Sequence, residues 1–239
     1  MSLLGIIQFS VMVAATLVLA STVILLSLLG LRRLAYLPVR AWAWTLLATT
    51  RVRYRSHGLD NVPEAEPYVV ISNHCSHLDG PTIALALPHP VYFVIKKELT
   101  KIPLWGLATQ KLGFIAVNRS DSAQARAEMA HAVETIRDGR RVLVFAEGTR
   151  SPDGQLQRFK KGGFHLAIDA QVPILPVTVN GSHALFPKSG TSVRPGILDV
   201  VVGRAIPTSG LGKEDVEELM AATREEILAA RRHDPGFTE

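Results

Sequence analysis

The N-terminal segment constrains the fold more than any other part of the chain. No charged side chain occurs from Ser2 to Leu31, and positions 11–29 are dense in Val, Leu, Ile and Ala. A helix of about 20 apolar residues crosses the roughly 30 Å hydrocarbon core of a bilayer. A cleaved signal peptide would instead have a positive start, a shorter apolar stretch and a small-residue cleavage site. The sequence therefore predicts a retained membrane anchor helix over residues 1–33.

A basic and aromatic segment follows the apolar stretch. Residues 34–55 contain Trp42 and Trp44 and no acidic residue. Trp and Arg together are typical of a membrane interface, so we expect an interfacial helix here, with a core helix of the following domain as the alternative. Because basic residues accumulate on the cytoplasmic side of an anchor, we expect the rest of the chain to be cytoplasmic. The arginines from position 32 to 55 are Arg32, Arg33, Arg40, Arg51, Arg53 and Arg55.

Charge and cysteine content narrow the possible partners. The net charge of +5 is compatible with nucleic acid, but the clustered arginines follow a membrane segment and do not form a separate basic face. This placement favours a membrane surface as the partner. The single cysteine, Cys75, excludes an internal disulfide and any zinc site built from paired cysteines, and it suits a reducing compartment.

Residues 56–239 alternate between strand and helix patterns. This alternation predicts one α/β domain, with a mixed, mostly parallel sheet flanked by helices. The expected strands lie at 68–72, 91–95, 113–117, 141–146, 174–179 and 197–202. The expected helices lie at 80–87, 97–112 with an interruption at Pro103, 121–138, 161–170 and 213–232.

The loop after the expected strand 68–72 carries the first candidate for chemistry. His74 lies directly after this strand region, and Asp79 follows five residues later. An imidazole can accept and return a proton near neutral pH, and a carboxylate on its far nitrogen fixes its tautomer. A turn that begins a helix brings two such residues to one face. The pair is therefore a candidate general base with its orienting carboxylate, and on the pair alone solvated or capping residues are the alternative.

A second candidate loop follows the expected strand 141–146. It contains Glu147, Gly148, Thr149 and Arg150. Glycine lets backbone amides approach a ligand, threonine adds a hydroxyl donor, and the planar fork of arginine suits a phosphate. A β-turn with a surface arginine is the alternative.

Two further basic residues, Arg119 and Lys160, are candidates for the same site. Arg119 follows the expected strand 113–117, and Lys160 precedes a Gly-Gly pair. Isolated surface cations are normally only solvated charges. Their shared placement near strand ends is what favours a pocket for an anionic group.

Four ordered blocks resemble the glycerolipid acyltransferases of the 1-acyl-sn-glycerol-3-phosphate acyltransferase type. His74 to Asp79 resembles the family's H-x4-D motif, and Phe145 to Ser151 resembles its E-G-T-R-S block. Residues 113–119 and 172–177 resemble two further blocks. The resemblance spans about residues 55–205 in order, which makes it far more specific than the short H-x4-D motif alone.

The resemblance implies transfer of a fatty acyl group without a metal or other cofactor. The donor would be acyl-CoA or acyl-carrier protein, and the acceptor the sn-2 hydroxyl of 1-acylglycerol 3-phosphate, giving phosphatidic acid. His74 would remove the hydroxyl proton while Asp79 steadies the imidazole. The expected partners are thus a lysophospholipid, the thioester donor and membrane lipids, and no nucleic acid. The residues implied in substrate binding are Arg119, Glu147, Gly148, Thr149, Arg150 and Lys160.

Three alternatives stay open. Another lysolipid could be the acceptor, because similar motifs serve several acceptors. A metal-dependent hydrolase could use His74, His77 and Asp79 as ligands, but it would need a further, distant histidine. A basic membrane scaffold would explain the anchor and the arginines, but it leaves the ordered blocks without a role.

Overall fold

The computed structural model describes residues 3–31, 34–118 and 121–231. Within these residues seven strands form one sheet in the order β1-β7-β6-β2-β5-β3-β4. Neighbouring strands are parallel except β6 and β7, which are antiparallel. The predicted α/β class with a mixed, mostly parallel sheet is therefore confirmed. The strands are β1 (Val52–His57), β2 (Val69–Ser72), β3 (Val91–Lys96), β4 (Ile115–Val117), β5 (Arg141–Phe145), β6 (Ile174–Asn180) and β7 (Gly196–Val202).

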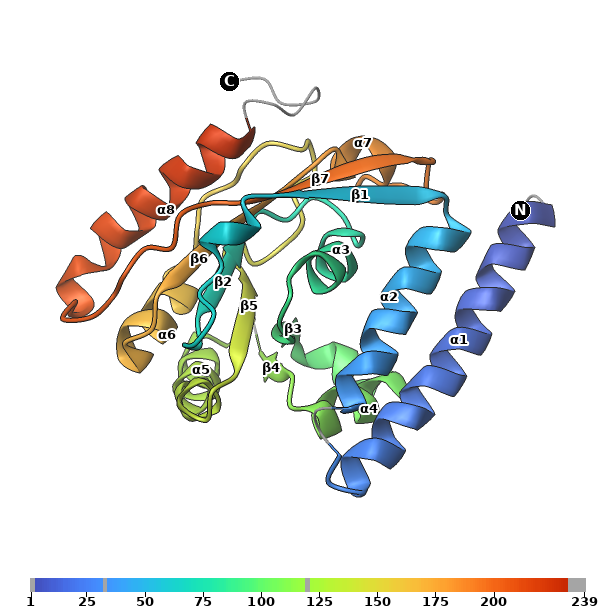
Figure 1. Ribbon diagram of the computed structural model, residues 1–239, viewed down its shortest axis with the longest axis horizontal. Helices are drawn as coiled ribbons and strands as arrows, with labels where there is room; N and C mark the ends of the chain where they lie inside the picture. Colours follow the sequence, from blue (N-terminus) through green and yellow to red (C-terminus); the bar gives the residue numbers. More distant parts are fainter. Residues whose placement is uncertain (1–2, 32–33, 119–120, 232–239) are drawn as a thin grey trace.

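Helices cover both faces of the sheet (Figure 1). Successive side chains of a strand point to opposite faces, so Val142 packs toward α5, α6 and α8 while Leu143 packs toward α3. Both faces of the central strands are buried, which explains why these strands are continuous apolar runs. The helices are α1 (Leu3–Leu28), α2 (Leu37–Thr49), α3 (Asp79–Ala86), α4 (Trp105–Leu112), α5 (Ser122–Arg137), α6 (Gly162–Ala170), α7 (Ser182–Leu185) and α8 (Val216–Arg231).

The edge strand β1 is not among the strands expected from the sequence. The expected interfacial helix covers residues 34–55, but α2 ends at Thr49 and β1 begins at Val52. Arg53 and Arg55 are exposed on β1, and only Val52 of this strand is buried. An edge strand with so little apolar content has no strong alternating pattern. The division into 1–33, 34–55 and 56–239 stays a prediction.

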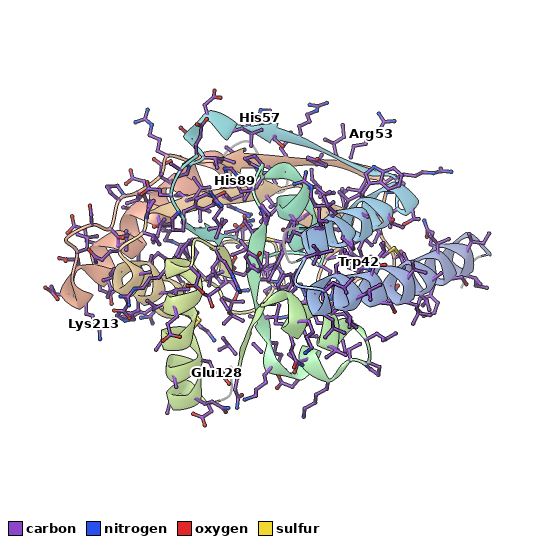
Figure 2. All side chains as sticks on the ribbon, turned by 60° about the horizontal axis from the view of Figure 1, so that its bottom comes forward. Trp42, Arg53, His57, His89, Glu128 and Lys213 are labelled. Atoms are coloured by element: carbon purple, nitrogen blue, oxygen red, sulfur yellow. The ribbon has the colours of Figure 1, made fainter. Side chains whose placement is uncertain are left out.

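The two N-terminal helices lie side by side and antiparallel (Figure 1). The Gln8 side-chain amide donates to the Thr49 carbonyl at 2.8 Å, and the Trp42 indole donates to the Thr16 hydroxyl at 2.9 Å. Figure 2 shows Trp42 where α2 meets α1. The α1 stretch Gly5–Leu28 has a mean hydropathy of 2.5, and only 11% of its most apolar part is buried. This exposed apolar surface favours association of α1 with a membrane.

The buried centre of the sheet should dominate stability. We expect Ile71→Ala to lower the free energy of unfolding by about 2–5 kcal/mol, because Ile71 is fully buried on β2 and a cavity would remain. Ile197→Ala is the matched control, since Ile197 is 44% exposed on β7 and should cost under about 1 kcal/mol. Thermal unfolding in detergent would measure both, and equal shifts in Tm would contradict the proposed core.

Candidate active site

Sheet pairing brings the two candidate loops together. Strands β2 and β5 are parallel neighbours, with Ser72 opposite Phe145 in the register. The loop with His74 follows the carboxyl end of β2, and the loop with Glu147 follows the carboxyl end of β5. The two loops therefore start side by side. Carboxyl ends of adjacent parallel strands are the usual place for a site in an α/β fold.

His74 and Asp79 contact each other directly. The Nδ1 atom of His74 lies 2.9 Å from Oδ2 of Asp79, which is the first residue of α3 and is fully buried. The same Oδ2 accepts the backbone N–H groups of Cys75 at 2.7 Å and Ser76 at 2.8 Å. Three contacts therefore fix the carboxylate, and the carboxylate in turn directs Nε2 of the imidazole away from α3.

The His74 ring is also held from its face. It stacks on the Phe145 ring with centroids 3.9 Å apart and 12° between the planes. The side chain of His74 is 17% exposed, so the imidazole is accessible from only part of its surroundings. This geometry suits a base that must keep one orientation during proton transfer.

The backbone of His74 is clamped by the second loop. Its N–H donates to Oε1 of Glu147 at 2.6 Å, and its carbonyl accepts the backbone N–H of Ser151 at 2.7 Å. The other oxygen of Glu147, Oε2, accepts the backbone N–H of Gln157 at 3.0 Å. Asn73, the residue before His74, is bonded to β6 through its side chain. Its Nδ2 donates to the Val179 carbonyl, and its Oδ1 accepts the Val179 N–H.

Glu147 is buried, and burial raises the pKa of its carboxyl to about 7 against the opposing effect of its backbone hydrogen bonds. Both of its oxygens accept backbone N–H groups, which favours a role in positioning the His74 loop. The contact with substrate that the resemblance implies for Glu147 stays a prediction.

The remaining predicted residues of the second loop lie beside the His74 pair. Thr149 and Arg150 line the same hollow as His74. Gly148 has a φ of +73° and the Lys160 side chain lies against it, so that a Cβ at this position would meet Lys160. The Thr149 hydroxyl accepts a hydrogen bond from Nζ of Lys188 at 3.3 Å, a contact that sequence reasoning missed. Arg119 lies outside the described residues.

An apolar hollow of about 590 Å³ adjoins the pair. Its lining includes His74 and Phe145 from the α/β domain. It also includes Ala20 of α1 and Trp42 of α2. The N-terminal helices therefore form part of the wall of the site. A volume of this size is typical of a ligand pocket.

Two groups, Arg231 and Cys75, are buried beneath the loop, and of these Arg231 was not expected from the sequence. Arg231, in the last turn of α8, is buried; its Nη2 donates to the Gly154 carbonyl, and its Nη1 lies 3.8 Å from Sγ of Cys75. Burial, with the nearby Asp79 carboxylate, raises the pKa of the Cys75 thiol to about 12. The thiol is therefore protonated at neutral pH and is a poor nucleophile.

Metal binding has little support in the geometry. Across residues 3–31, 34–118 and 121–231 there is no group of three or more His, Cys, Asp or Glu residues that could hold a metal ion.

Comparison with known proteins gives consistent similarities. A family model described as "Acyltransferase" matches residues 53–180. The chain is 36% identical to the 1-acyl-sn-glycerol-3-phosphate acyltransferase of Pseudomonas aeruginosa over 74% of this chain and 68% of the relative. It is 35% identical to the human 1-acyl-sn-glycerol-3-phosphate acyltransferase alpha over 76% and 64% of the two chains, so it spans about two thirds of the length of these relatives.

The structure is similar to a crystal structure of the 1-acyl-sn-glycerophosphate (LPA) acyltransferase, PlsC, from Thermotoga maritima. The TM-score is 0.82 at 25% sequence identity, and the match covers 96% of this chain and 95% of that chain. The similarity thus extends over the N-terminal helices as well as the α/β domain.

The clamp at Glu147 should contribute to the stability of the folded protein. We expect Glu147→Gln to destabilise the protein by about 1–3 kcal/mol at pH 4.5, because an amide NH2 replaces one accepting oxygen and leaves a buried backbone N–H without an acceptor. Thermal unfolding in detergent would measure the loss, with Glu225→Gln on the exposed side of α8 as the control.

The loss should also depend on pH. The Glu147 carboxyl keeps its proton up to about pH 7 in the folded protein but releases it near pH 4.5 when unfolded. Between these values the folded state binds more protons, so the stability of the wild type falls as pH rises, by up to about 1.4 kcal/mol per pH unit. Glutamine does not titrate, and the gap in Tm between wild type and Glu147→Gln should therefore narrow from pH 4.5 to pH 7. A gap that widens would contradict the raised pKa.

Proposed function

Because the chain belongs to the acyltransferase family, we propose that it is a 1-acylglycerol-3-phosphate O-acyltransferase. It transfers a fatty acyl group from acyl-CoA or acyl-carrier protein to the sn-2 hydroxyl of 1-acylglycerol 3-phosphate and gives phosphatidic acid. The observation that carries this proposal is the His74–Asp79 pair on the wall of an apolar hollow that Arg150 also lines. The site thereby combines a proton acceptor, a cation for a phosphate and space for an alkyl chain.

His74 acts as the general base in this proposal. Its Nε2 takes the proton of the acceptor hydroxyl as that oxygen bonds to the thioester carbonyl carbon. The carbon–sulfur bond then breaks, and the imidazolium returns the proton to the departing thiolate. Asp79, held by the N–H groups of Cys75 and Ser76, stabilises the imidazolium and keeps its tautomer. The thioester is already activated, so a covalent acyl-enzyme is not required.

The acceptor phosphate is placed against the loop after β5. Arg150 supplies the planar fork and Lys160, lying against Gly148, a second cation. Arg119 is proposed as a third from its position in the sequence. Lys188, bonded to Thr149, adds positive charge at the same loop. These contacts would hold the acceptor hydroxyl close to His74, and such positioning supplies much of the rate of a two-substrate reaction.

The acyl chain occupies the hollow in this proposal. Its lining is largely apolar and includes α1 and α2, so the membrane-associated helices also help to bind the donor chain. We further propose that the enzyme works at a membrane with its catalytic domain on the cytoplasmic face. The exposed apolar surface of α1 and the arginines after it support this placement.

The alternatives are less well supported. A different lysolipid acceptor would use the same residues, and only assay can separate it. A metal-dependent hydrolase lacks a set of three ligands among the described residues. A membrane scaffold would not require an oriented His–Asp pair on the wall of a hollow.

Loss of the base should slow acyl transfer strongly. We expect His74→Ala to lower kcat by about 10²–10⁴-fold, because a positioned general base contributes that much. The assay is thiol release from palmitoyl-CoA by detergent-purified protein with and without lysophosphatidic acid. His57→Ala is the matched control, since His57 forms an exposed His–Asp pair with Asp199 at 3.2 Å on the edge of the sheet (Figure 2) and should keep full activity.

The same assay tests the alternatives. Release that requires the acceptor and is unaffected by a chelator supports the proposal. Chelator-sensitive release without an acceptor would favour the metal-dependent hydrolase. Release with a different lysolipid but not with lysophosphatidic acid would assign another acceptor.

Room in the hollow should set the preferred chain length. Ala20→Leu adds three carbons to the α1 wall, and each buried methylene contributes about 0.8 kcal/mol. If two methylenes of a 16-carbon acyl chain no longer fit in the hollow, the ratio of kcat/KM for a 16-carbon donor to that for a 12-carbon donor should fall about tenfold. Ala41→Leu, on the exposed side of α2, is the control for the same change outside the hollow. Equal effects of both variants would argue against the hollow as the acyl site.

A further inference from the structure

Large apolar side chains gather on an exposed turn of the catalytic domain. This turn is formed by η3 (Lys97–Lys101) and the start of α4. Its exposed aliphatic residues are between 37% and 46% exposed, although they belong to the α/β domain and not to the N-terminal helices. These residues are Leu99, Ile102, Leu104 and Leu107.

The backbone of the turn adopts an unusual conformation. Leu104 has a φ of +59°, a conformation that branched residues rarely adopt. Gly106 lies so close to Thr100 that a Cβ would collide with the Thr100 carbonyl. The Gly106 N–H also donates to the Ile102 carbonyl at 2.8 Å, which closes the turn. Residues held in such sparsely populated conformations cluster at functional sites.

The turn is continuous with two features of the proposed site. Ala108 and Leu112 of α4 pack against Ala20 and Val23 of α1, so the helix that carries the exposed Leu107 lies against α1. Leu99 also lines the apolar hollow. The exposed turn therefore borders both the membrane-associated helix and the space proposed for the acyl chain.

The charges around the turn are mostly positive. Lys96 pairs with Glu98 at 3.3 Å and Lys97 pairs with Glu128 at 2.9 Å. Lys101 and Lys111 are exposed at the two ends of the turn and α4. Apolar side chains flanked by lysines suit the interface of a bilayer that contains anionic lipids, because the aliphatic groups enter the acyl boundary while the ammonium groups meet phosphates.

We propose that residues 97–111 form a second bilayer contact, which enters the headgroup region of an anionic leaflet beside α1 and opens the hollow toward the lipid. Two contacts on separate elements would hold the domain at one tilt relative to the membrane, whereas α1 alone would act as a tether. This inference rests on the membrane association within the proposed function, but not on the acyl-transfer reaction itself.

The single cysteine makes a direct test possible. Cys75 is buried and its thiol pKa is raised to about 12 by burial, so Ile102→Cys supplies the only thiol expected to react. A polarity-sensitive dye is attached to this variant, and the full chain is added to vesicles of phosphatidylcholine and phosphatidylglycerol with or without nitroxide-labelled lipids. We expect a blue shift and at least twofold quenching that grows with the phosphatidylglycerol fraction.

Two positions serve as controls. Leu59→Cys is labelled in the same way, because Leu59 is 40% exposed in η2 (Leu59–Asn61), at the opposite end of β1 from α2. Phe9→Cys, 64% exposed on α1, reports membrane binding by the helix. Quenching at Phe9 and Ile102 but not at Leu59 supports the proposal. Quenching at Phe9 alone would overturn the proposal. A blue shift at Ile102 that depends on protein concentration and not on vesicles would also overturn it, because it would indicate contact with a second copy of the chain.

An activity measurement separates this inference from the proposed function. The variant Ile102→Ser with Leu107→Ser should lower kcat/KM about tenfold for acceptor presented in vesicles and leave it unchanged for a short-chain acceptor dissolved in detergent. Leu59→Ser should change neither value. If no variant and no wild type transfers acyl groups, the proposed reaction fails, while the quenching result still decides the bilayer contact. An equal loss in vesicles and in detergent would overturn the bilayer contact, because it would indicate a role in folding or catalysis.

Discussion

The parallel pairing of β2 with β5 determines where the rest of the site can lie. It places the ends of two strands side by side, so that one loop can bond to the backbone of the other. Glu147 and Ser151 use this proximity to hold the N–H and the carbonyl of His74. The orientation of the imidazole by Asp79 and Phe145 is useful only because the backbone beneath it is already fixed.

The hollow joins two parts of the chain that the sequence presents as separate. Here α1 packs on α4 and contributes a wall of the hollow, so the membrane-associated helix is also part of the proposed donor site. Removing α1 would therefore change the pocket and expose the apolar side chains of α4, such as Ala108 and Leu112.

Local patterns predicted much of this arrangement. The central strands are continuous apolar runs, and α5 begins after Asp121, whose carboxylate accepts the N–H groups of Ala123 and Gln124. The spacing of His74 and Asp79 made their contact possible, and the resemblance of the ordered blocks to the family turned it into a prediction, which the structure agrees with. β1 was missed because its apolar content is low. The roles of Phe145 as a stacking partner and Arg231 as a buried donor depend on long-range packing, which short motifs do not encode.

The contact of Arg231 with the loop around Cys75 also has a consequence for synthesis, because its two sides are made at different times. Arg231 follows Cys75 by 156 residues and supports the Gly154 and Cys75 segments from α8. Chains are made from the N-terminus, and α1 is thus complete long before this support exists. A nascent chain can reach the lipid surface before Arg231 contacts Gly154 and Cys75. Delivery to the membrane would then precede catalytic competence, and a chain released before α8 would arrive at the bilayer without a finished site.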